Sequence, residues 1–260
     1  MLKDLLKIYE YREMLRNSVR KELRSRYKGS VLGFMWTFIN PLLMLIVYSI
    51  IFSRVMKVVV PGCSYTLFLF VGLIPWTYFS TALQQSTTII VANSNLIKKV
   101  YFPRLILPLT VTLTGLINML ITFIIVFAAV VLSRMPVTLL YFYLPLVAII
   151  QTLLVFAFSM IFAAVTVYLR DLEHIMSVAI MAWFYLTPIV YTAEYIPQDI
   201  FNLFKMNPMM VLVDSYRDIF LFARIPDFTA LTYVLMLAVI LLFIGYALYN
   251  KLQRRFAEEI

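Results

Sequence analysis

The sequence predicts an all-α integral membrane protein with six transmembrane helices, and three observations lead to that fold class. Of the 260 residues, 63% are hydrophobic and only 13% are charged, whereas about a quarter of the residues in an average soluble domain are charged. Six separate apolar stretches approach the roughly 20 residues that a helix needs to cross a bilayer. The basic residues gather on one side of these stretches, which orients the chain.

The six predicted spans follow one another with short polar connections. The first contains Asn40-Pro41, which should loosen or kink its helix, and the second is expected to bend at Pro75. The fourth is longer than one crossing needs and should begin in the membrane interface. The spans are residues 31–52, 65–92, 105–132, 139–169, 175–192 and 228–249.

Residues 1–28 predict an amphipathic helix in the membrane interface. Apolar side chains recur at spacings of three and four, and basic side chains fill the positions between them. Anionic headgroups attract such a helix, so we prefer this placement to a solvated helix in a soluble tail. The apolar stripe consists of Leu5, Ile8, Tyr11, Leu15, Val19, Leu23 and Tyr27.

Two connecting segments predict structure of their own. Residues 93–104 mix basic and apolar side chains, which indicates a short amphipathic element at the membrane face. Residues 193–227 hold two apolar pieces, near 200–204 and 209–222, that are too short or too polar to cross a membrane. We expect short interfacial or re-entrant helices there, packed against protein. We assign Asp214 and Asp218 to the surface of one of them.

The basic residues predict that both termini lie in the cytoplasm. With residues 1–28 inside, the inside segments hold sixteen Lys and Arg residues and the outside segments hold six. Positive charge favours the cytoplasmic side of a membrane. The net charge of +9 therefore indicates anionic lipid rather than nucleic acid as the partner of the basic helix.

Several kinds of chemistry have no residues to perform them. No predicted span carries an ionisable residue near its middle, which disfavours ion-coupled transport. No glycine-rich phosphate loop is present, so a nucleotide would have to bind another subunit. The lone Cys63 and the lone His174 offer no metal or redox site.

Five polar residues within spans are read as interhelical hydrogen-bonding groups: Asn40, Gln84, Gln85, Asn118 and Gln151.

Six short segments, in this order along the chain, together resemble one known family. They are residues 26–36 (RYKGSVLGFMW), 40–41 (NP), 98–104 (KKVYFPR), 168–171 (YLRD), 187–191 (TPIVY) and 207–208 (NP). The set resembles the permease subunit of ABC-2 transporters that export O-antigen or teichoic-acid polysaccharides on a lipid carrier. The resemblance covers essentially all of residues 1–260, which it makes a single transmembrane domain.

The resemblance implies partners and roles. It implies a homodimer of permeases in the cytoplasmic membrane with two ATP-binding subunits, which hold the ATP and magnesium, and no cofactor in this chain. Residues 93–104 would couple to the ATPase, residues 193–227 would form extracytoplasmic gate helices, and the pore would run between protomers. The implied coupling residues are Asn95, Lys98, Lys99, Tyr101, Arg170 and Asp171. The candidates for lining the passage are Trp36, Tyr48, Trp76, Tyr78, Phe79 and Tyr185.

Other interpretations of the sequence stay open. Lys98 and Lys99 also read as a plain topology signal. The same architecture would serve an ABC-2 permease for a drug or a small lipid. A membrane enzyme acting on lipid-linked sugars would need carboxylates clustered at one membrane face, for which Asp214 and Asp218 are the nearest candidates. A channel would need a polar or charged ring around its pore, and none is evident.

Overall fold

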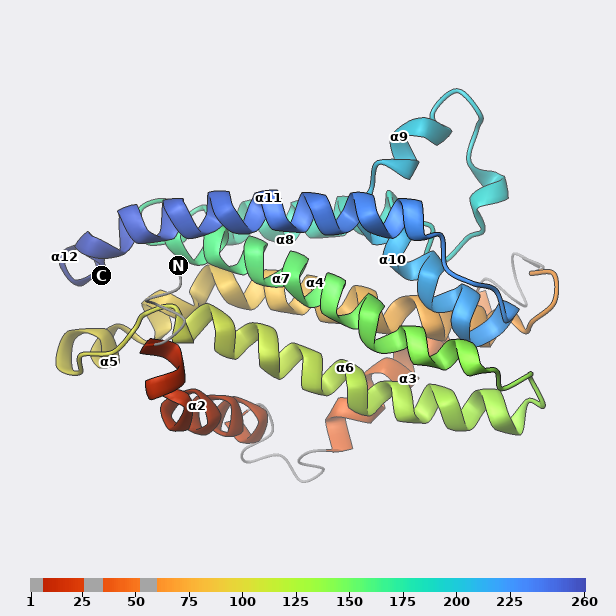
Figure 1. Cartoon of the computed structure of the whole chain (residues 1–260), viewed down its shortest axis with the longest axis horizontal. Helices are drawn as coiled ribbons and strands as arrows, with labels where there is room; N and C mark the ends of the chain where they lie inside the picture. The colour runs from red at the N-terminus through yellow and green to blue at the C-terminus, as the bar shows by residue number, and fades with distance from the viewer. Residues whose placement is uncertain (1–6, 26–34, 52–59) are drawn as a thin grey trace.

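The computed structural model describes residues 7–25, 35–51 and 60–260, and these form an elongated bundle of helices (Figure 1). All regular secondary structure in these ranges is helical. The described part of the chain contains four helices that are long and apolar enough to cross a membrane. They are α4 (Tyr65–Ala92), α6 (Ile106–Leu132), η3 with α7 (Leu139–Tyr143 and Leu144–Thr166) and α11 (Phe228–Leu252).

These four helices confirm the second, third, fourth and sixth predicted spans to within a few residues. Local capping explains two of the boundaries, because an N-cap oxygen satisfies backbone N–H groups that the first turn leaves free. The Ser64 hydroxyl accepts from the Leu67 N–H at the start of α4, and the Asp227 carboxylate accepts from the Thr229 N–H at the start of α11. The fourth span opens with the 3₁₀ segment η3, and its predicted start in the membrane interface stays a prediction.

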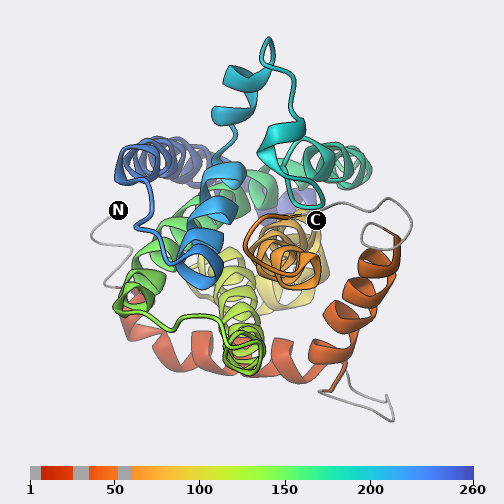
Figure 2. The same cartoon turned by 90° about the vertical axis from the view of Figure 1, so that its right-hand side faces the viewer.

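Helix α4 is the centre of the bundle, and the other helices surround it in the end-on view (Figure 2). In its most apolar stretch 78% of the residues are buried, against 22% for α11. Large apolar side chains of α6 and α11, including Ile124, Phe127 and Phe243, are exposed. A helix that exposes such residues is suited to a lipid environment.

Two glycines let the long helices approach closely. A Cβ on Gly115 of α6 would lie 2.6 Å from the Tyr78 ring of α4, and one on Gly245 of α11 would lie 3.0 Å from the Ala157 carbonyl oxygen of α7. Small residues at such contacts are typical of membrane helix packing.

The first predicted span is described only in part. Helix α3 covers Trp36–Ser49, 14 residues, and the helix continues through Asn40 and Pro41. Residues 31–34 and 52 of this predicted span lie outside the described residues. Leu5 and Tyr27 of the predicted N-terminal stripe also lie outside them.

The fifth predicted span is shorter than expected. Helix α8 covers Leu172–Tyr185, and residues 186–192 are non-helical although the prediction included them. Pro188 accounts for the difference, since proline has no N–H to continue the helical ladder and disfavours a helical residue before it.

Helix α2 (Arg12–Ser25) confirms the predicted amphipathic pattern of the N-terminal segment. It runs across the bundle rather than along it (Figure 2). Of the predicted stripe, Ile8, Tyr11 and Leu15 pack on one apolar cluster of the bundle and Val19 is buried. The basic side chains Arg12, Arg16, Arg20, Lys21 and Arg24 are exposed.

Residues 193–227 form short helices, as predicted. They are η4 (Ala193–Tyr195), α9 (Phe201–Lys205), α10 (Pro208–Arg217) and the π-helical turn η5 (Asp218–Phe222). The part with α9 stands clear of the bundle (Figures 1 and 2). Helix α10 packs against α4 instead, and most of its residues are buried.

Candidate coupling segment and gate

The predicted coupling segment forms a short helix at one end of the bundle, α5 (Ser94–Lys99) (Figure 1). Ile97 is buried beneath it, while Asn95, Lys98 and Lys99 are exposed. Tyr101 follows α5 and is 88% exposed. The segment therefore presents exposed basic side chains and an exposed aromatic ring, a surface that can bind another protein.

The predicted coupling segment is fastened to the end of α11 and to the residues that follow it. The Tyr249 hydroxyl donates to the Arg104 carbonyl at 2.9 Å, and the Arg104 guanidinium donates to the Gln253 carbonyl. The Arg104 guanidinium also lies 5.8 Å from the centre of the Phe256 ring. Tyr249 and Phe256 are fully buried in the cluster that holds Ile97 and Phe102. These contacts join the segment to the end of α11 and to the residues that follow it.

Arg170 and Asp171 lie in the connection between α7 and α8, at the same end of the bundle, and both are exposed. The Tyr168 hydroxyl donates to the Leu252 carbonyl at 2.8 Å, and Lys98 donates to the Ile260 carbonyl. The structure thus brings the two predicted coupling regions into contact with the two ends of residues 252–260.

At the other end of the bundle, α10 packs against protein, as predicted for the 209–222 piece. Arg217 of α10 is 2% exposed. Its guanidinium donates to the carbonyls of Pro188 at 2.7 Å and Ile189 at 2.8 Å. Asp214 lies 3.5 Å away and its side chain is 42% exposed.

Burial shifts the pKa of charged groups at this end of the bundle. Burial lowers the pKa of Arg217 to about 10, an effect that Asp214 opposes, so the guanidinium stays charged at neutral pH. Partial desolvation and the nearby Asp214 carboxylate raise the pKa of Asp218 to about 6.

The non-helical residues 186–191 are held by side chains from several elements. The Asn207 amide donates to the Leu186 carbonyl at 3.0 Å and to the Thr187 hydroxyl at 2.9 Å. The Tyr65 hydroxyl donates to the Val190 carbonyl at 2.8 Å. The backbone groups that Pro188 leaves without a helical partner thus find side-chain donors. We call residues 186–191 the gate turn.

Residues 14–221 match the family model described as ABC-2 type transporter. The chain belongs to the ABC-2 type transporter family. It is accordingly a permease, a transport subunit that spans a membrane several times and works with an ATPase subunit.

Relatives of this ABC-2 permease are named for the export of O-antigen or for the transport of polysialic acid. It is 34% identical to the O-antigen export system permease protein RfbA of Myxococcus xanthus over the full length of both chains. It is 36% identical to an RfbA of Klebsiella pneumoniae, covering 92% of this chain and 91% of the relative. It is 25% identical to the polysialic acid transport protein KpsM of Escherichia coli, covering 88% and 90%.

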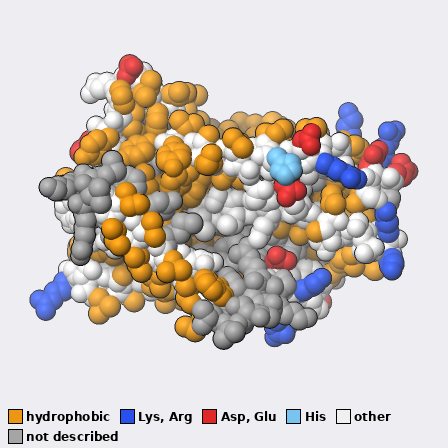
Figure 3. Space-filling view, turned by 180° about the vertical axis from the view of Figure 1, so that it is seen from behind, with side chains coloured by type: hydrophobic (Ala, Val, Ile, Leu, Met, Phe, Trp, Pro, Cys, Tyr) orange, Lys and Arg blue, Asp and Glu red, His pale blue; other side chains and the backbone are white. Residues whose placement is uncertain are grey.

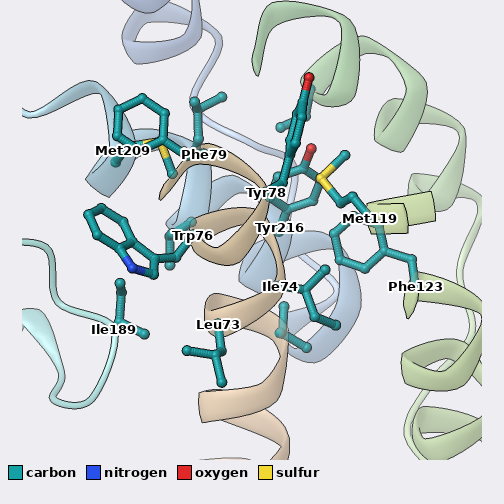
Figure 4. Close-up of a cluster of buried hydrophobic side chains, with 14 of the residues drawn as sticks. Leu73, Ile74, Trp76, Tyr78, Phe79, Met119, Phe123, Ile189, Met209 and Tyr216 are labelled. Carbon is teal, nitrogen blue, oxygen red and sulfur yellow. The ribbon is translucent and has the colours of Figure 1, made fainter. Parts of the chain in front are cut away.

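Three of the predicted lining residues lie inside the helix bundle of the ABC-2 permease. Trp76 and Phe79 of α4 pack among buried apolar side chains, and Tyr78 points to the other side of the same helix (Figure 4). The Trp76 ring lies 5.6 Å from the Phe184 ring, and Phe79 lies 5.0 Å from Trp183. Their position supports a packing role in this conformation.

The remaining lining candidates differ in exposure. Tyr185, the last residue of α8, is 63% exposed, and Trp36 at the start of α3 is partly exposed. The side chain of Tyr48 lies outside the described residues. Among the described residues, no group of three or more His, Cys, Asp or Glu could hold a metal ion.

Sequence reasoning missed the role of Arg217 and Asn207 in the gate turn. One signal was available, because an arginine three residues after an aspartate in an otherwise apolar helix indicates a buried ion pair as readily as a surface. The carbonyls that Arg217 reaches are 28 and 29 residues away in the sequence, and no local pattern identifies them.

Proposed function

We propose that this chain is the permease of an ATP-driven exporter of a lipid-linked polysaccharide of the O-antigen type. The observation that carries the proposal is the full-length similarity to the O-antigen export permease of Myxococcus xanthus. The more distant similarity to a polysialic acid transport protein supports a glycan cargo over a drug or a small lipid.

The chain works in the cytoplasmic membrane with six crossings and both termini inside. Two of these crossings use the shorter helices α3 and α8. Helices α2 and α5 lie close enough to line a cavity of about 560 Å³ together with the end of α4. Helix α4 begins at the far end of the bundle (Figure 1), which supports one crossing of the chain between α2 and α4. The same reasoning supports a crossing by α8 between α7 and α11.

The charged surface supports this orientation. Charged side chains gather mainly at the α5 and α12 end of the bundle, while apolar side chains cover much of the other half of the same face (Figure 3). Basic residues near the ends of spans favour the cytoplasmic side. At that end the described residues include Lys98, Lys99, Arg170, Lys251, Arg254 and Arg255.

Two permeases and two ATPase subunits form the transporter, and ATP and magnesium bind to the ATPase. Residues 93–104 couple each permease to its ATPase, with Lys98, Lys99 and Tyr101 at the contact and Arg170 and Asp171 at a second one. Asn95 adds an exposed amide to the first contact. The exposure of these side chains supports the assignment, because none is needed for a buried contact within the chain.

The passage for the polysaccharide runs between the two protomers. Helices α3 and α8 lie on the same side of α4 in the end-on view (Figure 2), which supports placing this side at the dimer axis. Closure of the ATPase dimer on ATP moves the coupling segments and separates these helices. Tyr185 and Trp36 are the lining candidates with exposed surface, and Tyr48 of α3 joins them by its place in the sequence.

Co-expression with the ATPase subunit of the same transporter tests the proposal. A complex of two permeases and two ATPases should form, and a lipid-linked O-antigen polysaccharide should stimulate its ATPase rate. A chain that purifies alone and chemically alters a lipid-linked sugar would establish the enzyme alternative. Stimulation by a drug or a small lipid, and not by the polysaccharide, would contradict the cargo.

Tyr101→Ala tests the coupling surface within the same complex. Because the ring is 88% exposed, its removal should leave the melting temperature of the isolated permease unchanged. It should weaken ATPase binding about 30-fold, the loss typical of an interface residue worth about 2 kcal/mol. Tyr195→Ala, a change at an exposed ring in η4 at the opposite end, is the control and should not affect binding. Equal binding by Tyr101→Ala and the unmodified chain would remove Tyr101 from the contact.

A further inference from the structure

Arg217 connects three separate elements of the gate end. It belongs to α10, and it donates to two carbonyls of the gate turn that follows α8. Its Nε also donates to the Phe68 carbonyl of α4 at 3.4 Å. A guanidinium has five donors in a fixed plane, so it can hold several carbonyls in one arrangement, which an ammonium cannot do.

Helix α4 provides a shaped socket for this guanidinium. The Arg217 guanidinium lies 3.5 Å from the centre of the Phe68 ring, a close cation–π contact. One turn further along α4, a Cβ on Gly72 would lie 2.6 Å from an Arg217 terminal nitrogen. Only glycine leaves that space, so the side chain and the socket fit each other.

Hydrogen bonds from Arg217, Tyr65 and Asn207 hold the gate turn in place. Arg217 holds Pro188 and Ile189, and Tyr65 of α4 holds Val190. Asn207, the residue that caps α10, holds Leu186 and Thr187. Breaking the bonds from Arg217 and Tyr65 would leave the buried carbonyls of Pro188, Ile189 and Val190 without donors, which is unfavourable.

We propose that Arg217 is a positioning residue that makes the end of α8, helix α10 and the start of α4 move as one body during export. The inference rests on the proposed function, in which α8 moves at the dimer axis. Because α10 is fixed to the end of α8 through Arg217, the gate follows α8 without a contact of its own to the ATPase. Export and ATP hydrolysis stay coupled as long as this connection holds.

Arg217→Lys in the complete transporter tests the proposal. Lysine keeps the charge but loses the planar set of donors and most of the stacking on Phe68. Assembly with the ATPase and the basal ATPase rate should stay within twofold of the unmodified transporter. Polysaccharide exported per ATP hydrolysed, in vesicles loaded with lipid-linked O-antigen polysaccharide, should fall at least tenfold. Arg224→Lys, at an exposed arginine near the same end, is the matched control and should change neither quantity.

Hydrogen exchange separates positioning from a general loss of stability. In Arg217→Lys, amide exchange should rise at least tenfold in residues 186–191 and 208–222, with no change in residues 94–104. Unchanged export per ATP, or reduced export without faster exchange in these two segments, would overturn the proposal.

If Arg217→Lys fails to assemble with the ATPase, a milder variant tests the same proposal. Tyr65→Phe removes the hydroxyl that donates to the Val190 carbonyl, and it should raise exchange in residues 186–191 and lower export per ATP about threefold. No change in either quantity would overturn the proposal. An unmodified complex that hydrolyses ATP but exports no polysaccharide would instead contradict the proposed function. The exchange pattern of Arg217→Lys would still show whether Arg217 connects the gate turn to α10.

Discussion

Gln151 shows how the bundle accommodates a polar side chain in an apolar interior. The residue is fully buried in α7. Its amide nitrogen donates to the Pro75 carbonyl of α4 at 2.8 Å, and its amide oxygen accepts from the Tyr216 hydroxyl of α10 at 3.0 Å. One side chain thus joins three helices, which confirms its predicted interhelical role.

Replacing Gln151 with leucine should destabilise the permease. The change keeps a similar volume but leaves the buried Tyr216 hydroxyl without its acceptor, and losing such a partner costs about 1–3 kcal/mol. Thermal unfolding in detergent should show a lower melting temperature for Gln151→Leu than for the unmodified chain. Gln85→Leu is the matched control, because the half-buried side chain of Gln85 makes no hydrogen bond described in the structure. An equal drop in melting temperature in the two variants would show that loss of a polar side chain, and not loss of these hydrogen bonds, lowers the stability.

The other predicted interhelical residues show the limit of composition as a guide. Gln84 donates to the Glu173 carbonyl at the start of α8, at 3.4 Å, and confirms the prediction. Both polar atoms of the Asn118 side chain are buried without a hydrogen-bond partner among the described residues, so the prediction is wrong for that residue in this conformation. Asn40 is exposed on α3. The residue type predicts a need for a partner, and only packing decides whether one is in reach.

At the scale of elements, the coupling segment depends on the residues after α11. Phe256 is fully buried and lies edge-on to Tyr249 with 5.6 Å between ring centres. Since Tyr249 also donates to the Arg104 carbonyl, the two rings support the C-terminal side of the coupling segment.

Phe256→Ala should loosen the coupling segment without unfolding the bundle. Truncating a buried phenylalanine typically costs about 3–5 kcal/mol, and here the loss falls on the contact between residues 253–260 and the segment. Amide exchange in residues 94–104 should rise at least tenfold, and stimulation of the ATPase by polysaccharide should fall. Phe243→Ala, at an exposed position of the same α11, should leave both unchanged. Unchanged exchange in residues 94–104 of Phe256→Ala would exclude this support.

The elements that could be predicted from sequence are those that one local signal specifies. Helix α4 begins at Tyr65 and ends at Ala92, as the apolar run between Ser64 and Asn93 predicted. The gate end could not be predicted in the same way. The end of α8 at Tyr185 has a local cause in Pro188, but the burial of Arg217 depends on the socket at Gly72 of α4. The contact between Arg217 and Gly72 joins residues far apart in the sequence, which periodicity does not report.

At the scale of the whole molecule, helices α3 and α8 are too short to cross a membrane by themselves. Each has 14 residues, about 21 Å at 1.5 Å per residue, less than the roughly 30 Å of a hydrocarbon core. A crossing built on either helix therefore needs its flanking residues as well. For α8 these flanking residues include the gate turn, whose carbonyls are satisfied by side chains, which makes non-helical backbone tolerable at membrane depth.

The proposed topology predicts which positions a membrane-impermeant thiol reagent reaches. In a chain whose native cysteine is replaced by Cys63→Ser, Lys99→Cys, Arg254→Cys and Arg20→Cys should react only after the cells are permeabilised. Leu203→Cys in α9 should react in intact cells, because it belongs to the opposite end of the bundle (Figure 1).

If α3 failed to cross, Arg20→Cys and Lys99→Cys would label on opposite sides, although the structure brings α2 and α5 to one cavity. If α8 failed to cross, Arg254→Cys would label on the side opposite to Lys99→Cys. Agreement of the three inside positions would thus require both short helices to span the membrane.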